Sequence, residues 1–320
     1  MRRFAVVFTA LAVLATLVAP TFAQTETIVD VAVSNEDFST LVAAVTEAEL
    51  VEALSSEGPF TVFAPTNDAF AALLEEMEIG AEDLLASEDL SDILLYHVVA
   101  GEFDAASVIE LVGDNDYVLV DTLNGTPVKV SVQDGAVFVN DSQVVAADVE
   151  ASNGVIHVVD SVILPPSQTI AEIVVDAASM GEDSEFTILL AAVLEANLAE
   201  ALSGEGPFTV FAPTDAAFAA ALEALDVSAE ELLANPDLAS ILLYHVVGGE
   251  EALYSNDVVA ALDGMNDGVS VDTLLEGDPI KVTANEMGIY VDGAQIIQTD
   301  ILASNGVIHV IDAVILPDGE

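Results

Sequence analysis

An internal duplication constrains this chain more than any other feature of its sequence. Residues 58–66 read Gly-Pro-Phe-Thr-Val-Phe-Ala-Pro-Thr, and the same nine letters return at residues 206–214, 148 positions later. Nine identical residues at that separation indicate a tandem duplication, because chance alone does not preserve such a run.

Two further motifs recur in the same order. Ile-Leu-Leu-Tyr-His-Val-Val at residues 93–99 returns at 241–247 with the same offset. Ala-Ser-Asn-Gly-Val-Ile-His-Val at 151–158 returns at 303–310 with an offset of 152, so the second copy carries four additional residues between these motifs. A period near 150 is the size of a domain and far exceeds a solenoid repeat of about 20–50 residues. The sequence therefore predicts two homologous domains in series.

The N-terminus is typical of an exported protein. Two arginines follow the initiator methionine, residues 4–19 are apolar and small residues close the segment, so we predict a signal peptide at residues 1–23. The apolar run is shorter than the ~20 residues of a spanning helix, which disfavours the alternative of an uncleaved membrane anchor. We expect a first domain at 24–165, a stiff proline-containing linker at 166–168 and a second domain at 169–320.

The composition adds an extreme negative charge. Beyond the predicted signal peptide the chain has 56 acidic residues and two lysines, Lys129 and Lys281, for a formal charge of −54. Such a surface excludes phosphate backbones and anionic membranes as partners, because both bind basic surfaces. Hydrophobic residues make up 53% of the chain, so we expect a folded protein with an acidic surface and not a disordered chain. Cysteine is absent, and stability must come from hydrophobic cores without disulfides.

This charge predicts a protein that works in a salty or cation-rich medium. Like charges repel one another in the folded state, and salt screens that repulsion over a Debye length of about 10 Å at 0.1 M. The melting temperature of residues 24–320 should therefore rise by several degrees as salt is added. A calorimetric series that gives one melting temperature at every salt concentration would favour an acidic exported protein with no salt requirement.

Within each copy the first half is patterned as helix and the second half as strand. Phe38 and Leu41 begin an i, i+3, i+4, i+7 apolar pattern, which is one face of a helix. Residues 60–63 favour a buried strand, and Thr66 is then the N-cap of a helix that we expect Gly80 to terminate. The other elements expected in the first copy are helices near 82–85, 90–95 and 104–111 and strands at 117–120, 127–132, 136–140, 143–147 and 155–164. This order predicts an α+β fold.

The repeated motifs resemble those of the fasciclin domain family. The Gly-Pro-Phe-Thr-Val-Phe-Ala-Pro-Thr run resembles its first signature segment, Asn-Gly-Val-Ile-His-Val-Val-Asp at 153–160 resembles its second, and the Tyr-His pair lies between them. The resemblance covers residues 27–165 and 169–317. It implies that each copy folds as a compact β-sandwich or wedge flanked by helices. It also implies a secreted or surface-attached module associated with adhesion and matrix binding.

The resemblance extends to candidate binding residues. In animal members the Tyr-His segment and an Asp-Ile dipeptide before the second signature are implicated in receptor binding. By position, the corresponding residues of this chain are Tyr96, His97, Tyr244, His245, Asp300 and Ile301. The first copy has Asp148-Val149 in place of the dipeptide, so the match is complete only in the second copy.

The histidines occupy two equivalent places in each copy: His97, His157, His245 and His309. Because each lies in an apolar segment, we expect buried imidazoles bonded to a nearby acid or carbonyl, with partner binding as the alternative. A hydrolase triad of Ser152, His157 and Asp160 is disfavoured. On one strand His157 and Asp160 would point to opposite faces, and no oxyanion-hole motif accompanies them. We therefore expect no catalytic residues and no enzymatic activity.

Acidic loops are the candidate cation sites. Residues 114–116 (Asp-Asn-Asp) and Asp263 with residues 266–267 (Asn-Asp) offer oxygen ligands that suit Ca²⁺, although neither follows a known metal-binding motif. We expect no resident metal or cofactor, and only weak Ca²⁺ binding by the whole acidic surface. Lys129 and Lys281 share one strand position in the two copies, and we expect each to pair with a carboxylate in a structural role.

These patterns together predict a non-enzymatic, secreted adhesion or binding protein that acts at a cell surface, in an extracellular matrix or in a periplasm. Its partner would be a surface or matrix protein or a polysaccharide, not a nucleic acid, and no membrane insertion is expected after signal cleavage. The alternative is a Ca²⁺-dependent polysaccharide- or matrix-binding protein that uses its acidic surface.

Overall fold

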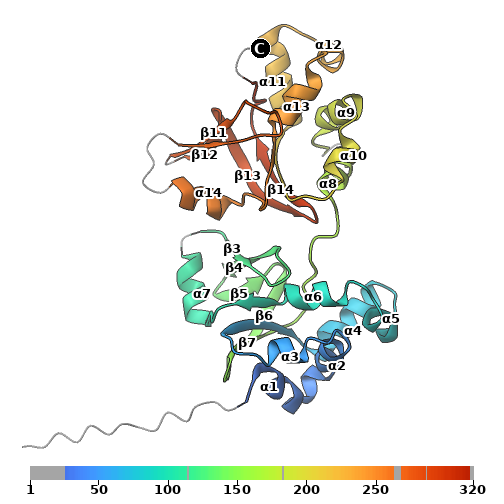
Figure 1. Ribbon diagram of the computed structural model, residues 1–320, viewed down its shortest axis with the longest axis vertical. Coiled ribbons are helices and arrows are strands. Elements are labelled where there is room, and N and C mark those ends of the chain that lie inside the picture. The colour runs from blue at the N-terminus through green and yellow to red at the C-terminus, as the bar shows by residue number, and fades with distance from the viewer. Residues whose placement is uncertain (1–25, 114, 182–183, 263–267, 286, 318–320) are drawn as a thin grey trace, which may run out of the picture.

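The computed structural model contains two domains that follow one another along the chain (Figure 1). The predicted signal peptide lies outside the residues that the structure describes, and in the described part of the chain no helix is both long and apolar enough to cross a bilayer. The predicted linker at 166–168 lies in a segment without helix or strand. The described residues are 26–317, except 114, 182–183, 263–267 and 286.

The first domain places most of its helices before most of its strands. Its helices are α1 (Ile28–Ser34), the 3-10 helix η1 (Glu36–Phe38), α2 (Ser39–Glu47), α3 (Val51–Leu54), α4 (Asn67–Glu76), α5 (Ala81–Leu85), α6 (Leu90–Tyr96) and α7 (Ala105–Val112). Its strands are β1 (Phe60–Pro65), β2 (Val98–Ala100), β3 (Val118–Asp121), β4 (Pro127–Gln133), β5 (Ala136–Val139), β6 (Ser142–Ala151) and β7 (Gly154–Val159).

The second domain repeats this order of elements. Its helices are α8 (Ile170–Ala178), α9 (Thr187–Glu195), α10 (Ala199–Leu202), α11 (Asp215–Leu225), α12 (Ala229–Leu233), α13 (Leu238–Tyr244) and α14 (Ser255–Leu262). Its strands are β8 (Phe208–Pro213), β9 (Val246–Gly248), β10 (Val269–Val271), β11 (Ile280–Asn285), β12 (Gly288–Val291), β13 (Ala294–Ala303) and β14 (Gly306–Ile311).

Each domain contains one seven-stranded sheet. The strand order is β2-β1-β7-β6-β5-β4-β3 in the first domain and β9-β8-β14-β13-β12-β11-β10 in the second. The strand of the first repeated motif, β1, pairs in parallel with β7, which carries the third motif, and Phe63 lies opposite His157. β8 and β14 pair in the same way. The two most strongly repeated segments are therefore adjacent strands.

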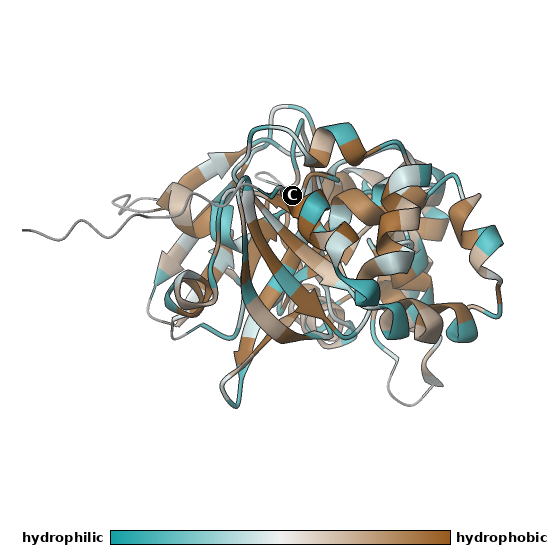
Figure 2. Ribbon diagram, turned by 90° about the horizontal axis from the view of Figure 1, so that it is seen from below, coloured by the Kyte–Doolittle hydropathy of each residue, from teal (hydrophilic) through white to brown (hydrophobic). Residues whose placement is uncertain are grey.

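The strand β1 is buried on both faces, which explains why its sequence is apolar without alternation. Val62 and Ala64 belong to a core between the sheet and helices α1 to α6. Phe63 points the other way, into a second core that the two halves of the sheet and α7 enclose. Helices α1 to α6 gather on one side in Figure 1, with α7 on the other, and Figure 2 shows hydrophobic and hydrophilic residues mixed along the helices.

The sheet closes over the second core because β6 bends. The register between β6 and β7 shifts between Val144 and Ala146 and again between Ala146 and Val149, and such bulges kink a strand. Asp148 takes a left-handed conformation with φ 58° at this point. The result is a bent seven-stranded sheet with flanking helices, so the predicted α+β fold is confirmed.

One helix end differs from the prediction. Thr66 caps α4 as expected, because its hydroxyl oxygen accepts from the N–H three residues later at 3.2 Å. The prediction that Gly80 terminates this helix is wrong: α4 ends at Glu76, and the chain turns at Glu78 with φ 55°. Gly80 precedes α5 instead, and its N–H donates to the Asp83 carboxylate at 2.9 Å.

Candidate functional site

Tyr96 lies at the end of α6, between the helical half of the first domain and its sheet. The side chain is fully buried. Its hydroxyl donates to the Pro127 carbonyl oxygen at 3.1 Å and accepts from Nδ2 of Asn140 at 3.1 Å. In the second domain the Tyr244 hydroxyl donates to Oδ2 of Asp292 at 2.7 Å. Each tyrosine therefore fastens a helix to the strand hairpin on the far side of the core.

His97, the next residue, is buried with both ring nitrogens in hydrogen bonds. Nδ1 lies 2.7 Å from the Ile93 carbonyl oxygen, and Nε2 accepts from the Ile163 N–H at 3.1 Å. Because Nε2 accepts, the ring is neutral and Nδ1 carries the proton. His245 repeats both bonds at 2.8 and 3.2 Å. Burial lowers the pKa of each imidazole, His97 and His245, to about 4.

These depressed pKa values predict that stability is lost as the pH falls. The folded pKa of His97 is about 4 and the ordinary value is 6.5, so between these values the proton binds the unfolded chain alone. Wild type should lose about 2 kcal/mol between pH 7 and 5 that a His97→Gln variant does not lose. Urea titrations at both pH values measure the difference in the free energy of unfolding between the two proteins. The contributions of the carboxylates cancel in this difference, because both proteins share them. A difference that is the same at pH 7 and at pH 5 would contradict the prediction.

The second pair of histidines lies on the signature strands. His157 in β7 places Nε2 2.7 Å from the Phe103 carbonyl oxygen, and its ring stacks on Phe63 with 6.0 Å between centroids. The predicted strand at 155–164 ends at Val159, so Asp160 lies beyond β7, where its carboxylate accepts from the Gln143 N–H at 2.9 Å. His157 and Asp160 thus have different partners, and their geometry matches the structural role expected for the histidine.

Asp300 joins the two domains. Its side chain is fully buried. The hydroxyl of Tyr117, just ahead of β3 in the first domain, donates to Oδ2 at 2.7 Å and lies 2.8 Å from Oγ1 of Thr299. From the second domain the Ser255 N–H donates to Oδ1 at 2.9 Å, and the Ser255 hydroxyl donates to Oδ2. Figure 1 shows β3 at the edge of the first domain that faces the second. We call these four residues, together with Lys129, the docking cluster.

Lys129 adds a positive charge to the docking cluster. Nζ lies 4.8 Å from the centre of the Tyr117 ring, a cation–π contact. Burial lowers the pKa of Lys129, and the negative charges of Asp300 and Asp141 oppose that shift. Burial, with a contribution from the Asp300 carboxylate, raises the pKa of Tyr117 to about 12. The tyrosine therefore stays protonated and remains a hydrogen-bond donor at neutral pH.

The positions equivalent to Asp300 and Lys129, each in the opposite domain, are exposed to solvent. Asp148 accepts from the Ala105 N–H at 2.8 Å, as Asp300 does from Ser255, yet Asp148 is exposed. Lys281 is exposed where Lys129 is half-buried. The docking cluster therefore joins the β3 edge of the first domain to the Asp300 site of the second domain, which is a head-to-tail arrangement.

The six candidate binding residues do not form one surface. Tyr96, His97, Tyr244, His245 and Asp300 are buried, and Ile301 is half-buried against the helical core. The Tyr-His pairs act as internal fasteners, and Asp300 belongs to the docking cluster. Their role in binding a partner stays a prediction.

No group of three or more acidic or histidine side chains is placed to hold a metal within the part of the chain that the structure describes. Of the predicted cation sites, Asp114 and residues 263–267 lie outside that part.

The model of the Fasciclin domain matches the sequence twice, over residues 36–165 and 184–317. The chain belongs to the fasciclin domain family. Protein sll1483 of Synechocystis sp. is 57% identical over 143 residues, which are 44% of this chain and 74% of that protein. Transforming growth factor-beta-induced protein ig-h3 of Sus scrofa is 31% identical over 274 residues, 83% of this chain and 36% of that protein, so this chain spans about a third of that relative. A solved FAS1 domain pair from the insect cell adhesion molecule Fasciclin I aligns with 88% of this chain and 98% of that chain, at 20% identity and a TM-score of 0.41.

Sequence reasoning missed the partners of Asp300. Tyr117, Ser255 and Thr299 belong to no repeated motif of the two fasciclin domains. A signal was available in the difference between the copies. Tyr117 directly precedes the first residue of β3, and Gly268 holds the corresponding place before β10. A large side chain in one copy where the other copy has glycine marks a position whose role the two domains do not share.

Proposed function

We propose that this protein is an exported, non-enzymatic binding protein that adheres to a cell surface or an extracellular matrix through its two fasciclin domains. The observation that carries the proposal is the docking of the domains through Tyr117 and Asp300. Because docking holds the domains in one orientation, a surface on each domain can engage one target at the same time, and avidity then raises weak affinities by roughly 10²–10⁴. Family membership supports the proposal, since the fasciclin resemblance implies adhesion and matrix binding.

The absence of catalysis is part of the proposal. Its support is that each of the four histidines has both ring nitrogens in hydrogen bonds to the backbone. We expect no cofactor requirement and no turnover of ester or glycoside substrates above background. Turnover that a His157→Ala substitution abolishes would overturn this part.

A retention assay tests the binding proposal. Residues 24–320 are applied to cells of the producing organism and to its isolated matrix at low and high salt, with Ca²⁺ and with EDTA. We expect retention that survives both EDTA and high salt, as a specific protein or polysaccharide partner requires. Retention only with Ca²⁺ would favour the alternative, in which the acidic surface bridges to an anionic polymer through the cation. No retention under any condition would refute adhesion.

The docking cluster makes a separate prediction. Tyr117→Phe removes the hydroxyl that donates to the Asp300 carboxylate but keeps the ring beneath Lys129. A hydrogen bond to a charged group contributes about 1.5–3 kcal/mol, so we expect the domains to separate and retention to fall by about ten-fold or more. Small-angle scattering should show a larger radius of gyration. The control is Tyr290→Phe, a half-buried tyrosine of β12, and equal retention by both variants would show that docking does not serve binding.

A further inference from the structure

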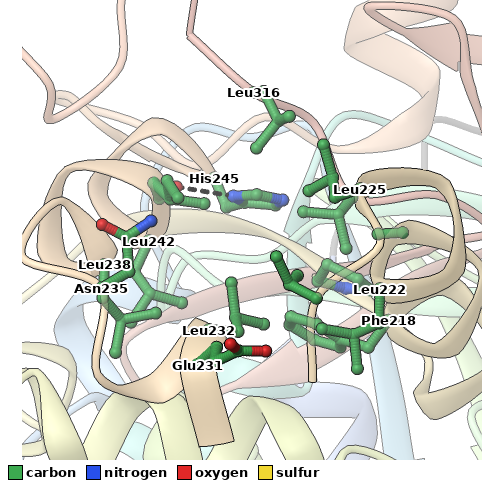
Figure 3. Close-up of a pocket in the computed structure, with 15 residues that line it drawn as sticks. Phe218, Leu222, Leu225, Glu231, Leu232, Asn235, Leu238, Leu242, His245 and Leu316 are labelled. Atoms are coloured by element: carbon green, nitrogen blue, oxygen red, sulfur yellow. Dashed lines mark hydrogen bonds between the residues drawn. The ribbon is translucent and has the colours of Figure 1, made fainter. Parts of the chain in front are cut away.

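An apolar cavity of about 280 Å³ in the second domain has no part in the proposed adhesion. It lies between α11, α12, α13 and the chain after β14. Figure 3 shows Phe218 and Leu222 on one side, Leu238 and Leu242 on the other, and Leu316 near His245 at one end. Most of the lining is apolar.

The first copy shows how the cavity arises. Ala221 lines it, and the corresponding residue of the first copy is Leu73, which is buried in the helical core with 7% of its surface exposed. Val227 likewise stands where the first copy has Ile79. The surrounding helices have not closed over the lost volume: α12 buries no residue, while its counterpart α5 buries Leu84. The second domain has therefore lost carbon atoms from the cavity wall without collapsing.

Each polar side chain at the cavity wall makes at least one hydrogen bond within the protein. The Glu231 carboxylate accepts from the N–H and hydroxyl of Ser228 at 2.8 and 2.9 Å, which caps α12. Oδ1 of Asn235 accepts from the Asp237 N–H at 2.9 Å. His245 is neutral, with both nitrogens bonded. The remaining charge at the wall is that of Glu231, on a chain with a large negative charge, and both repel an anionic ligand.

We infer that this cavity binds a small neutral apolar molecule, aromatic or branched aliphatic, of roughly twelve carbon atoms. An apolar cavity of about 150 Å³ stays dry and accepts benzene, so nearly twice that volume suits about twice the carbon. Such a ligand supplies the dispersion contacts that the walls lack. It requires no polar anchor.

Two dyes that share a ring system test the inference. N,N-dimethyl-1-naphthylamine has twelve carbon atoms, is neutral and fluoresces in apolar surroundings, and 5-dimethylaminonaphthalene-1-sulfonate adds a negative charge. Titrated into residues 24–320, the neutral dye should bind one site per chain, about ten-fold or more tightly than the anionic dye. Ala221→Leu, which introduces the residue of the first copy, should lower the affinity for the neutral dye by about ten-fold or more. Ala221→Val, which adds less carbon, should give a smaller loss.

Matched variants decide where the dye binds. Ala220→Leu makes the same change on the exposed face of α11 and should leave binding unchanged. Leu73→Ala opens the corresponding space in the first domain and should add a second site. Circular dichroism of each variant confirms that it is folded. The inference is overturned if wild type does not bind the neutral dye, or if Ala221→Leu and Ala220→Leu bind it equally, because the dye would then occupy another apolar surface.

Discussion

Gly154→Ala should cost the first domain about 4 kcal/mol or more of its free energy of unfolding. Gly154 opens β7 and pairs with Phe60 of β1. A Cβ at this position would overlap the Phe60 carbonyl oxygen and lie 2.8 Å from its nitrogen. The clashing atoms belong to the Phe60 backbone in the parallel pair of β1 and β7, so the clash is relieved only by separating two buried strands. The positive φ of Gly154, 151°, adds further strain for an alanine.

Gly135→Ala is the matched control for this prediction. Gly135 also has a positive φ, 82°, but a Cβ there would meet no atom within 4 Å. The control should therefore cost about 1 kcal/mol, the price of the backbone conformation alone. Urea unfolding of residues 24–320, followed by circular dichroism, compares the two variants. If Gly154→Ala is no more destabilising than the control, β1 and β7 are not packed as closely at Gly154 as its contact with the Phe60 backbone requires.

Leu73→Ala should cost the first domain about 3 kcal/mol, because it leaves a cavity in a packed helical core. The reciprocal change, Ala221→Leu, should be neutral or stabilise the second domain by up to about 1 kcal/mol, since it fills existing space. Ala220→Leu, on the exposed face, should change stability by no more than about 0.5 kcal/mol.

Thermal and urea unfolding of the three variants measure these differences independently of any ligand. A large loss on Ala221→Leu would mean that the wall of the cavity cannot accept the side chain that the first copy carries. The asymmetry between the two domains would then have another cause than the lost leucine.

Much of the fold could be predicted because its determinants are local or repeated. The nine-residue motif predicted a buried strand followed by a capped helix, and both are present, since β propensity and an N-cap threonine act within a few residues. Gly80 misled the prediction because another residue, Glu78, took the left-handed turn that ends α4. The burial of His97 and His157 also followed from their apolar surroundings.

The sequence alone determined that the chain holds two α+β domains of one family, with an acidic surface over apolar cores. Only the tertiary structure decided that Asp300 is buried while its counterpart Asp148 is exposed. Tyr117 lies 183 residues from Asp300 in the chain, and no local pattern encodes a contact across that separation. The replacement of Leu73 by Ala221 is visible in the letters, yet whether neighbouring helices collapse into the lost volume depends on packing from all sides. Local chemistry therefore determined the helices and strands. Packing between distant segments determined that the Asp300 site is covered while the Asp148 site is exposed, and that a cavity remains beside Ala221.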